Sequence, residues 1–115
     1  AQGGGPSPTP TPTPPPSGSP PAAPSNLAAT AVSGPAVNLS WSDNASNETG
    51  FYVERCSGSS SCTNFTRIAT VAANTTSYTD SGLAARTQYR YRVQAYNGGG
   101  ASSYSNIATV RTRFR

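Results

Sequence analysis

The sequence predicts an all-β domain of seven short strands behind a proline-rich N-terminal segment, and three observations indicate this. Within Leu83–Asn97, apolar and polar residues alternate over nine positions, which is typical of a strand with one buried face. From Pro24 onward, short alternating runs are separated by turn-forming residues, and no helical period occurs. Residues 1–23 consist almost entirely of Pro, Thr, Ser, Gly and Ala, so a single core of about ninety residues comes after them.

The seven predicted strands are rich in β-branched and aromatic residues, which favour extended structure. The longest is expected to turn four side chains into the core and four outward. The inward set is Tyr89, Tyr91, Val93 and Ala95, and the outward set is Arg90, Arg92, Gln94 and Tyr96. The predicted strands are Asn26–Ala31, Ala36–Trp41, Gly50–Cys56, Phe65–Val71, Ser77–Thr79, Gln88–Tyr96 and Asn106–Thr112.

Residues 1–23 are predicted to form an extended stalk of polyproline II type. Alternating proline fixes φ and removes backbone donors, which excludes a helix or the interior of a sheet. The chain therefore divides into a linker (1–23), a folded domain (24–112) and a C-terminal tail (113–115). Thr9, Thr11 and Thr13, each between prolines, have the composition of O-glycosylated stalks, although an unmodified linker fits equally well.

The formal net charge of +4 comes from eight arginines, with no lysine or histidine, against four acids. Basic charge suggests nucleic acid or an acidic polymer as a partner. The arginines are scattered, however, without a basic helix, zinc-ligand spacing or an RNA-binding aromatic signature, so solvated strand faces are expected rather than a nucleic-acid site. No apolar run is long enough for a membrane-spanning helix, so no membrane insertion is predicted.

The two cysteines, Cys56 and Cys62, enclose the residues S-G-S-S-S. With no histidine and no second cysteine pair, a zinc site would lack two of its four usual ligands. A disulfide is therefore predicted, with a pair of free thiols as the alternative. Closing so short a loop stabilises the fold by about 2 to 2.5 kcal/mol, and the bond requires an oxidising, secreted or cell-surface location.

Four motifs occur in order along the folded domain: V-N-L-S-W ending at Trp41, E-T-G-F-Y-V-E-R at Glu48–Arg55, L-x-x-x-T-x-Y at Leu83–Tyr89, and S-Y-S-N before the last strand. In this order and spacing they resemble the fibronectin type III domain, in the form found in secreted bacterial proteins. The resemblance covers about Pro24–Thr112. It implies a seven-stranded, Greek-key, immunoglobulin-like sandwich, with Tyr89 as the tyrosine-corner residue whose hydroxyl bonds to backbone upstream.

The residues predict no enzyme, no cofactor and no metal site. Without histidine or lysine, no serine or cysteine has its usual base. Only four carboxylates are present, and no two are expected to share a cleft, as glycoside hydrolysis requires. Asp43 and Glu48 fall in a polar loop, and Asp80 falls in a turn. Glu54 is expected on an outward strand face, where Arg90 or Arg92 would be its partner.

Two surface features remain as candidate sites. One is an interaction face, because tyrosine and arginine are enriched at interfaces, although half-exposed sheets also carry them. Its residues are Tyr52, Glu54, Arg90, Arg92, Gln94 and Tyr96. The other is a set of N-glycosylation sequons in predicted loops, at Asn44, Asn47 and Asn74.

Composition and resemblance together predict a non-enzymatic extracellular structural module, a rigid spacer or assembly unit on a stiff stalk. Its partners would be other protein modules or copies of itself. Two alternatives stay open. One is a self-assembling subunit of an extracellular filament or surface coat. The other is an accessory carbohydrate-binding module of a secreted polysaccharide-degrading enzyme, with polysaccharide bound by Tyr52, Tyr96 and Tyr104.

Overall fold

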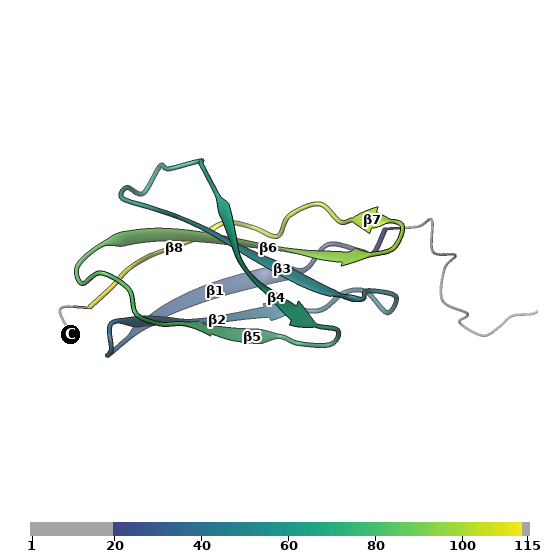
Figure 1. The fold of residues 1–115 in the computed structure, drawn as a ribbon, viewed down its shortest axis with the longest axis horizontal. Helices are drawn as coiled ribbons and strands as arrows, with labels where there is room; N and C mark the ends of the chain where they lie inside the picture. The colour runs from purple at the N-terminus through teal and green to yellow at the C-terminus, as the bar shows by residue number, and fades with distance from the viewer. Residues whose placement is uncertain (1–19, 114–115) are drawn as a thin grey trace, which may run out of the picture.

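Two antiparallel β-sheets packed face to face make up the structure, a computed structural model that describes residues 20–113 (Figure 1). This architecture confirms the predicted all-β sandwich. Residues 1–19 of the predicted stalk, including Thr9, Thr11 and Thr13, lie outside the described residues. The first sheet contains β1 (Ser25–Val32), β2 (Ala36–Ser42) and β5 (Ser77–Asp80), in the order β1-β2-β5. The second contains β4 (Thr66–Ala72), β3 (Gly50–Ser57) and β6 (Gln88–Asn97), in the order β4-β3-β6, with β7 (Gly100–Ala101) and β8 (Ala108–Arg111) both paired to β6.

The core lies between the sheets and consists of the alternate residues of the central strands. Trp41 and Phe51, from opposite sheets, meet edge to face with their ring centroids 5.8 Å apart, a favourable aromatic geometry. Ile68 and Leu83 are only half-buried and pack against the rim of this core. The largest fully buried side chains are Val37, Leu39, Phe51, Val53, Tyr91 and Val93. Tyr91 and Val93 were predicted to face inward.

The central pair of the second sheet, β3 and β6, is the longest ladder in the molecule. Its register runs without a break from Gly50 opposite Tyr96 to Ser57 opposite Tyr89. Because side chains alternate along both strands, this register decides at once which residues enter the core and which face outward. Strand β6 has ten residues and a length of about 33 Å.

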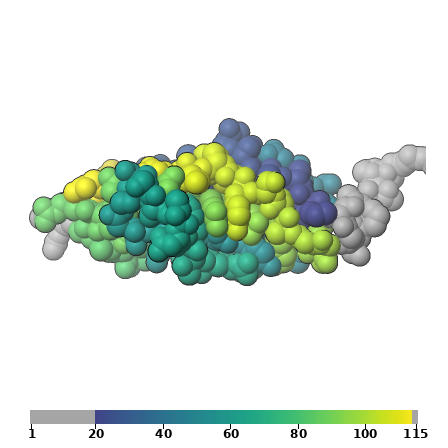
Figure 2. All heavy atoms as spheres, turned by 90° about the horizontal axis from the view of Figure 1, so that it is seen from above, coloured from purple at the N-terminus to yellow at the C-terminus, as the bar shows by residue number. Residues whose placement is uncertain are grey.

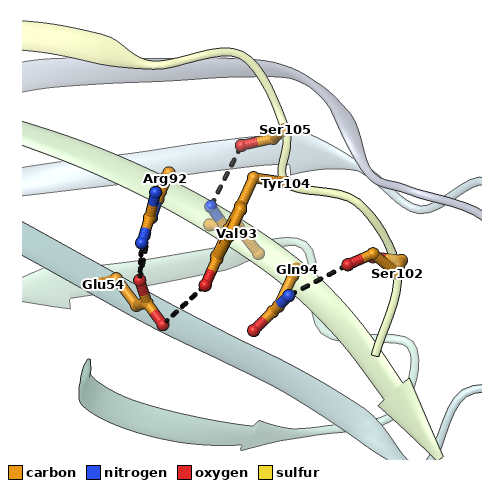
Figure 3. Close-up of polar contacts among 7 residues, drawn as sticks. All are labelled: Glu54, Arg92, Val93, Gln94, Ser102, Tyr104 and Ser105. Atoms are coloured by element: carbon orange, nitrogen blue, oxygen red, sulfur yellow. Dashed lines mark hydrogen bonds and ion pairs between the residues drawn. The ribbon is translucent and has the colours of Figure 1, made fainter. Parts of the chain in front are cut away.

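The last strand differs from the prediction. A single strand was expected over Asn106–Thr112, but pairing with β6 is divided between β7 and β8. Two serines between them use their hydroxyls in place of backbone carbonyls. The Ala95 N–H donates to Ser102 Oγ at 2.9 Å. The Val93 N–H donates to Ser105 Oγ at 3.0 Å (Figure 3).

The backbone N–H groups of the same two serines also bond to β6. They donate to the Ala95 and Val93 carbonyls, each at 2.7 Å. The chain therefore stays bonded to β6 between β7 and β8 without forming regular strand there, and no β6 amide is left unpaired at these positions.

Asn106 joins the two sheets at this edge. Its Oδ1 accepts from the Leu27 N–H and its Nδ2 donates to the Leu27 carbonyl, both at 2.9 Å. The side-chain amide thus pairs with β1 as a backbone peptide would. The register of β1 shifts between Ser25 and Ala28, and Asn26 in that interval has a φ of 56°.

We expect Ser105→Ala to lower the free energy of unfolding by about 1–3 kcal/mol, because the buried Val93 N–H loses its acceptor. Urea unfolding at neutral pH measures this loss. Ser103→Ala is the matched control: Ser103 is exposed in the same segment, and its replacement should change stability by less than about 0.5 kcal/mol. Equal losses in both variants would contradict the role assigned to the Ser105 hydroxyl.

Candidate functional site

The outward side chains of β3, β4, β6 and β8, with those of Phe65 and Tyr104, form what we call the outer face. At one end of it three planar groups are stacked. The rings of Tyr52 and Tyr96 lie 4.1 Å apart with their planes 5° from parallel. The Arg67 guanidinium lies 3.5 Å from the centre of the Tyr52 ring. Tyr96 and Arg67 cannot both lie on the same side of the Tyr52 ring. They therefore cover its two faces.

A second stack is centred on Arg92. Its guanidinium lies between Tyr104, at 3.6 Å from the ring centre, and Phe65, at 4.3 Å. Its Nε and Nη2 both approach Glu54 Oε1 at 2.8 Å (Figure 3). The Tyr104 hydroxyl donates to the other Glu54 oxygen at 3.3 Å. Glu54 is therefore only 7% exposed, although it lies on an outward strand face.

The remaining predicted face residues are also engaged. Gln94 is 8% exposed, and its Nε2 donates to the Ser102 carbonyl at 2.9 Å. Arg90 Nη1 donates to the carbonyl of Cys62, whose disulfide with Cys56 is formed, with an S–S distance of 2.01 Å. The structure thus brings the six residues of the predicted interaction face together as a packed layer, in which Glu54 and Gln94 are covered by their neighbours.

Four contributors to this layer were absent from the predicted face: Gly50, Phe65, Arg67 and Tyr104, the last of which was predicted only as a sugar-binding residue. A Cβ on Gly50 would lie 2.3 Å from the Val71 carbonyl and 3.2 Å from the Tyr96 ring and hydroxyl. Only glycine leaves room for that ring. Arg67 lies opposite Glu54 because the β3–β4 register shifts between Val53 and Glu54. A bulge of this kind has no clear signal in the sequence.

Tyr89 connects β6 to the turn before it. Its ring is buried, and its hydroxyl oxygen accepts from the Ala84 N–H at 3.0 Å. The acceptor and donor are five residues apart, which is the geometry of a tyrosine corner. This feature belongs to the architecture of the fold and leaves no group free for chemistry.

Comparison with known proteins agrees with this architecture. The family model for the fibronectin type III domain matches residues 22–111, most of the chain. This chain belongs to the fibronectin type III family. A solved fibronectin type III-like protein from Clostridium thermocellum is 36% identical, with a TM-score of 0.66, and the match covers 79% of this chain and 92% of that one. The predicted resemblance is confirmed.

Curated relatives contain the same domain within larger proteins. An alpha-amylase of Niallia circulans is 43% identical over 95 residues, which cover 80% of this chain and 7% of the amylase. Chitinase A1 of the same organism is 39% identical over 95 residues, covering 80% of this chain and 12% of the chitinase. The chain therefore spans only a small part of the curated relatives that it matches.

The acids of this fibronectin type III domain are engaged within it. Asp80 was expected in a turn, but it belongs to β5 and is 6% exposed. Its Oδ2 accepts from the Tyr91 hydroxyl at 2.7 Å and from Arg55 Nη1 at 2.8 Å. Burial and then the hydrogen bond to Asp80 raise the pKa of Tyr91 well above that of a free tyrosine. Burial opposes the charge on Arg55, but Asp80 raises the pKa of that guanidinium overall.

The two loop acids have local partners. Glu48 Oε2 accepts from the Asn74 N–H at 3.0 Å, and Asp43 Oδ1 accepts from the Ala45 N–H at 3.1 Å. Across residues 20–113, no three His, Cys, Asp or Glu side chains gather as a metal site would need. Over the same residues, no helix is long and apolar enough to cross a membrane.

The candidate glycosylation sites differ in access. Both Nδ2 bonding positions of Asn44 are used, since it donates to the Ala23 carbonyl at 3.0 Å and to Ser25 Oγ at 2.9 Å. A glycan there would displace one of these bonds. Asn47 is half-buried, whereas Asn74 is exposed in the turn between β4 and β5. Asn74 is therefore the most accessible of the three.

Tyr91→Phe should flatten the loss of stability at alkaline pH. A raised folded-state pKa contributes stability below the unfolded value of about 10. Above that pH the unfolded chain releases a proton that the folded one keeps, and stability falls by up to about 1.4 kcal/mol per pH unit. Urea unfolding at several pH values above about 10 should show a slope smaller by one proton in Tyr91→Phe.

Ser103→Ala is the control for this experiment, because it changes an exposed side chain that has no ionisable group. It should keep the wild-type slope. An unchanged slope in Tyr91→Phe would show that the phenol bonded to Asp80 does not set the alkaline stability.

Proposed function

We propose that this chain is a non-enzymatic, extracellular structural module that spaces and orients neighbouring segments of a larger secreted protein. The observation that carries the proposal is the position of its ends. The described chain begins beside β7 at one end of the sandwich and finishes beyond β8 at the opposite end (Figure 1). A module with this arrangement keeps its N-terminal and C-terminal neighbours apart by about the length of β6, roughly 33 Å.

The N-terminal end is packed against the domain. Pro21 and Pro24 are buried. Pro20 Cγ lies 3.7 Å from the position that a Cβ on Gly100 would take. Asn44 holds the Ala23 carbonyl through its Nδ2. These contacts support a fixed direction for the chain at the point where the linker meets the sandwich.

The C-terminal end is held in a similar way by Thr112. Its hydroxyl donates to the Ala84 carbonyl at 2.6 Å and accepts from the Thr87 N–H at 2.9 Å. The Arg86 N–H donates to the Arg113 carbonyl at 3.2 Å. With both ends bonded to the sandwich, a displacement of one neighbour would be transmitted to the other.

The relatives support the class of protein to which the module contributes. Domains of this family are generally non-catalytic, and here they match parts of an alpha-amylase and a chitinase. We therefore place this module beside a polysaccharide-degrading domain, outside the cell, where the Cys56–Cys62 disulfide persists. The stalk, with Thr9, Thr11 and Thr13 as O-glycosylation candidates, would be the spacer on its N-terminal side.

The spacer role predicts a narrow distance distribution between the two ends. Spin labels on Ala22→Cys and Arg113→Cys, both at exposed positions, can be attached specifically because Cys56 and Cys62 are bonded to each other. Pulsed electron resonance should give one sharp peak in the range set by β6. A broad distribution in the otherwise unaltered chain would contradict a rigid spacer.

Asn44→Ala in the doubly labelled chain tests the N-terminal attachment. It removes the bonds to Ala23 and Ser25, so the distribution of label-to-label distances should broaden while the midpoint of thermal unfolding changes little.

Sedimentation of the unlabelled chain should show monomers. Assembly into long particles would favour a filament subunit instead.

A further inference from the structure

The two sheets carry very different outward side chains. On the first sheet they form an uncharged grid of small residues. One row runs across the sheet through Thr30, Asn38 and Thr79, and the next through Ala28, Ser40 and Ser77. The outer face of the second sheet carries four arginines and four aromatic rings. They are Arg67, Arg90, Arg92, Arg111, Tyr52, Phe65, Tyr96 and Tyr104.

Positive charge accumulates on that face because one carboxylate opposes four guanidinium groups. Glu54 is that carboxylate, and it is bonded to Arg92. Among residues 20–113, no carboxylate pairs with Arg67, Arg90 or Arg111. The other acids are elsewhere, in the loop between β2 and β3 or, for Asp80, facing Tyr91 in the interior.

The strand registers arrange the arginines in a stripe. Arg67 lies opposite Glu54, which lies opposite Arg92, so these two arginines share one row across the sheet. Arg90 is two residues earlier on β6, and Arg111 lies opposite Gln88, a further two residues along. Successive rows on a strand are about 6.6 Å apart. The stripe therefore presents regularly spaced positive charge to an extended molecule.

Stacking on aromatic rings orients two of these guanidinium groups in advance. Arg67 lies on Tyr52 and Arg92 lies between Phe65 and Tyr104. The Nε and Nη2 of Arg92 are already bonded to Glu54. A stacked guanidinium without a carboxylate partner keeps its N–H edge available for paired bonds to a ligand carboxylate, and less side-chain entropy is lost when it binds. Arg67 is exposed, so its edge is accessible to a ligand.

Apolar surface adjoins the stripe. Tyr104 is 39% exposed and Ile107 is 42% exposed, and they are the large apolar side chains that stand out from the described part of the chain. Figure 2 shows the segment that carries them, in yellow, beside the teal segment around the disulfide loop. An extended ligand with carboxylates on one side and C–H groups on another would meet both kinds of surface.

We propose that the outer face binds an acidic polysaccharide, a chain of uronic acid residues whose carboxylates meet the arginine stripe and whose sugar rings cover Tyr104. The charge complementarity requires a polyanion, and the exposed ring beside it favours sugar over a purely ionic partner. This binding does not depend on the spacer role. The distance measurement depends on how the two ends of the domain are attached, whereas ligand binding depends on the side chains of its outer face.

Affinity electrophoresis of the full chain through gels containing polygalacturonate, amylose or polyglutamate, at about 0.15 M salt, tests the proposal. We expect retardation by polygalacturonate and none by amylose. Arg67→Gln with Arg111→Gln should weaken binding about tenfold, as expected when hydrogen bonds to a charged group are lost. Tyr104→Ala should weaken retardation by polygalacturonate more than any retardation by polyglutamate, because it removes the ring that the sugar covers as well as the contacts of that ring with Arg92 and Glu54.

The matched control places charge on the uncharged sheet. Thr30→Glu with Ser40→Glu lowers the net charge by two, from +4 to +2, as the double arginine variant does. It should change binding less than about twofold, equivalent to less than about 0.4 kcal/mol. Equal losses in the two double variants, or equal retardation by polyglutamate and polygalacturonate, would overturn the proposal. So would the absence of retardation by polygalacturonate.

Discussion

The register between β3 and β6 is the constraint on which the rest of this domain depends. It places Val53 beside Val93 in the core and, one residue later, Glu54 beside Arg92 on the outer face. A slip of one residue would carry the arginines of β6 into the core and its valine and tyrosines into water. The burial of charge would then cost far more than any new pairing could recover. Core and outer face are therefore specified by the same set of hydrogen bonds.

Polar groups inside the sandwich reinforce this register. Asp80 on β5 accepts from Tyr91 on β6 and from Arg55 on β3, so one carboxylate joins the first sheet to the central pair of the second. Such a group is tolerated in the interior only where its hydrogen bonds are complete and a countercharge is present. A shifted register would separate Asp80 from Tyr91 and also from Arg55. The interior thus penalises alternatives that hydrophobic packing alone would accept.

Sequence reasoning succeeded where structure follows from local periodicity and failed where it depends on contacts between distant residues. The alternation in β6 predicts its buried and exposed sets because a strand has a fixed period. Asp80 precedes Ser81 and Gly82, which favour a turn, and nothing nearby reveals Arg55 or Tyr91 as its partners. Ser102 and Ser105 lie in a stretch that has the composition of a loop, although their hydroxyls bond to β6. The position of Arg67 depends on a bulge that only the paired strands define.

The composition of the outer face exceeds what folding requires. The first sheet shows that small uncharged residues are sufficient to cover the outside of this sandwich, since Thr30, Asn38 and Ser40 do so there. Four arginines on the second sheet instead raise electrostatic repulsion, which Glu54 relieves only for Arg92. Stacking on Tyr52, Phe65 and Tyr104 offsets part of this cost but does not remove the charge. A polyanion lying along the stripe would remove it, so the face that is least favourable for the isolated domain is the one best suited to a ligand.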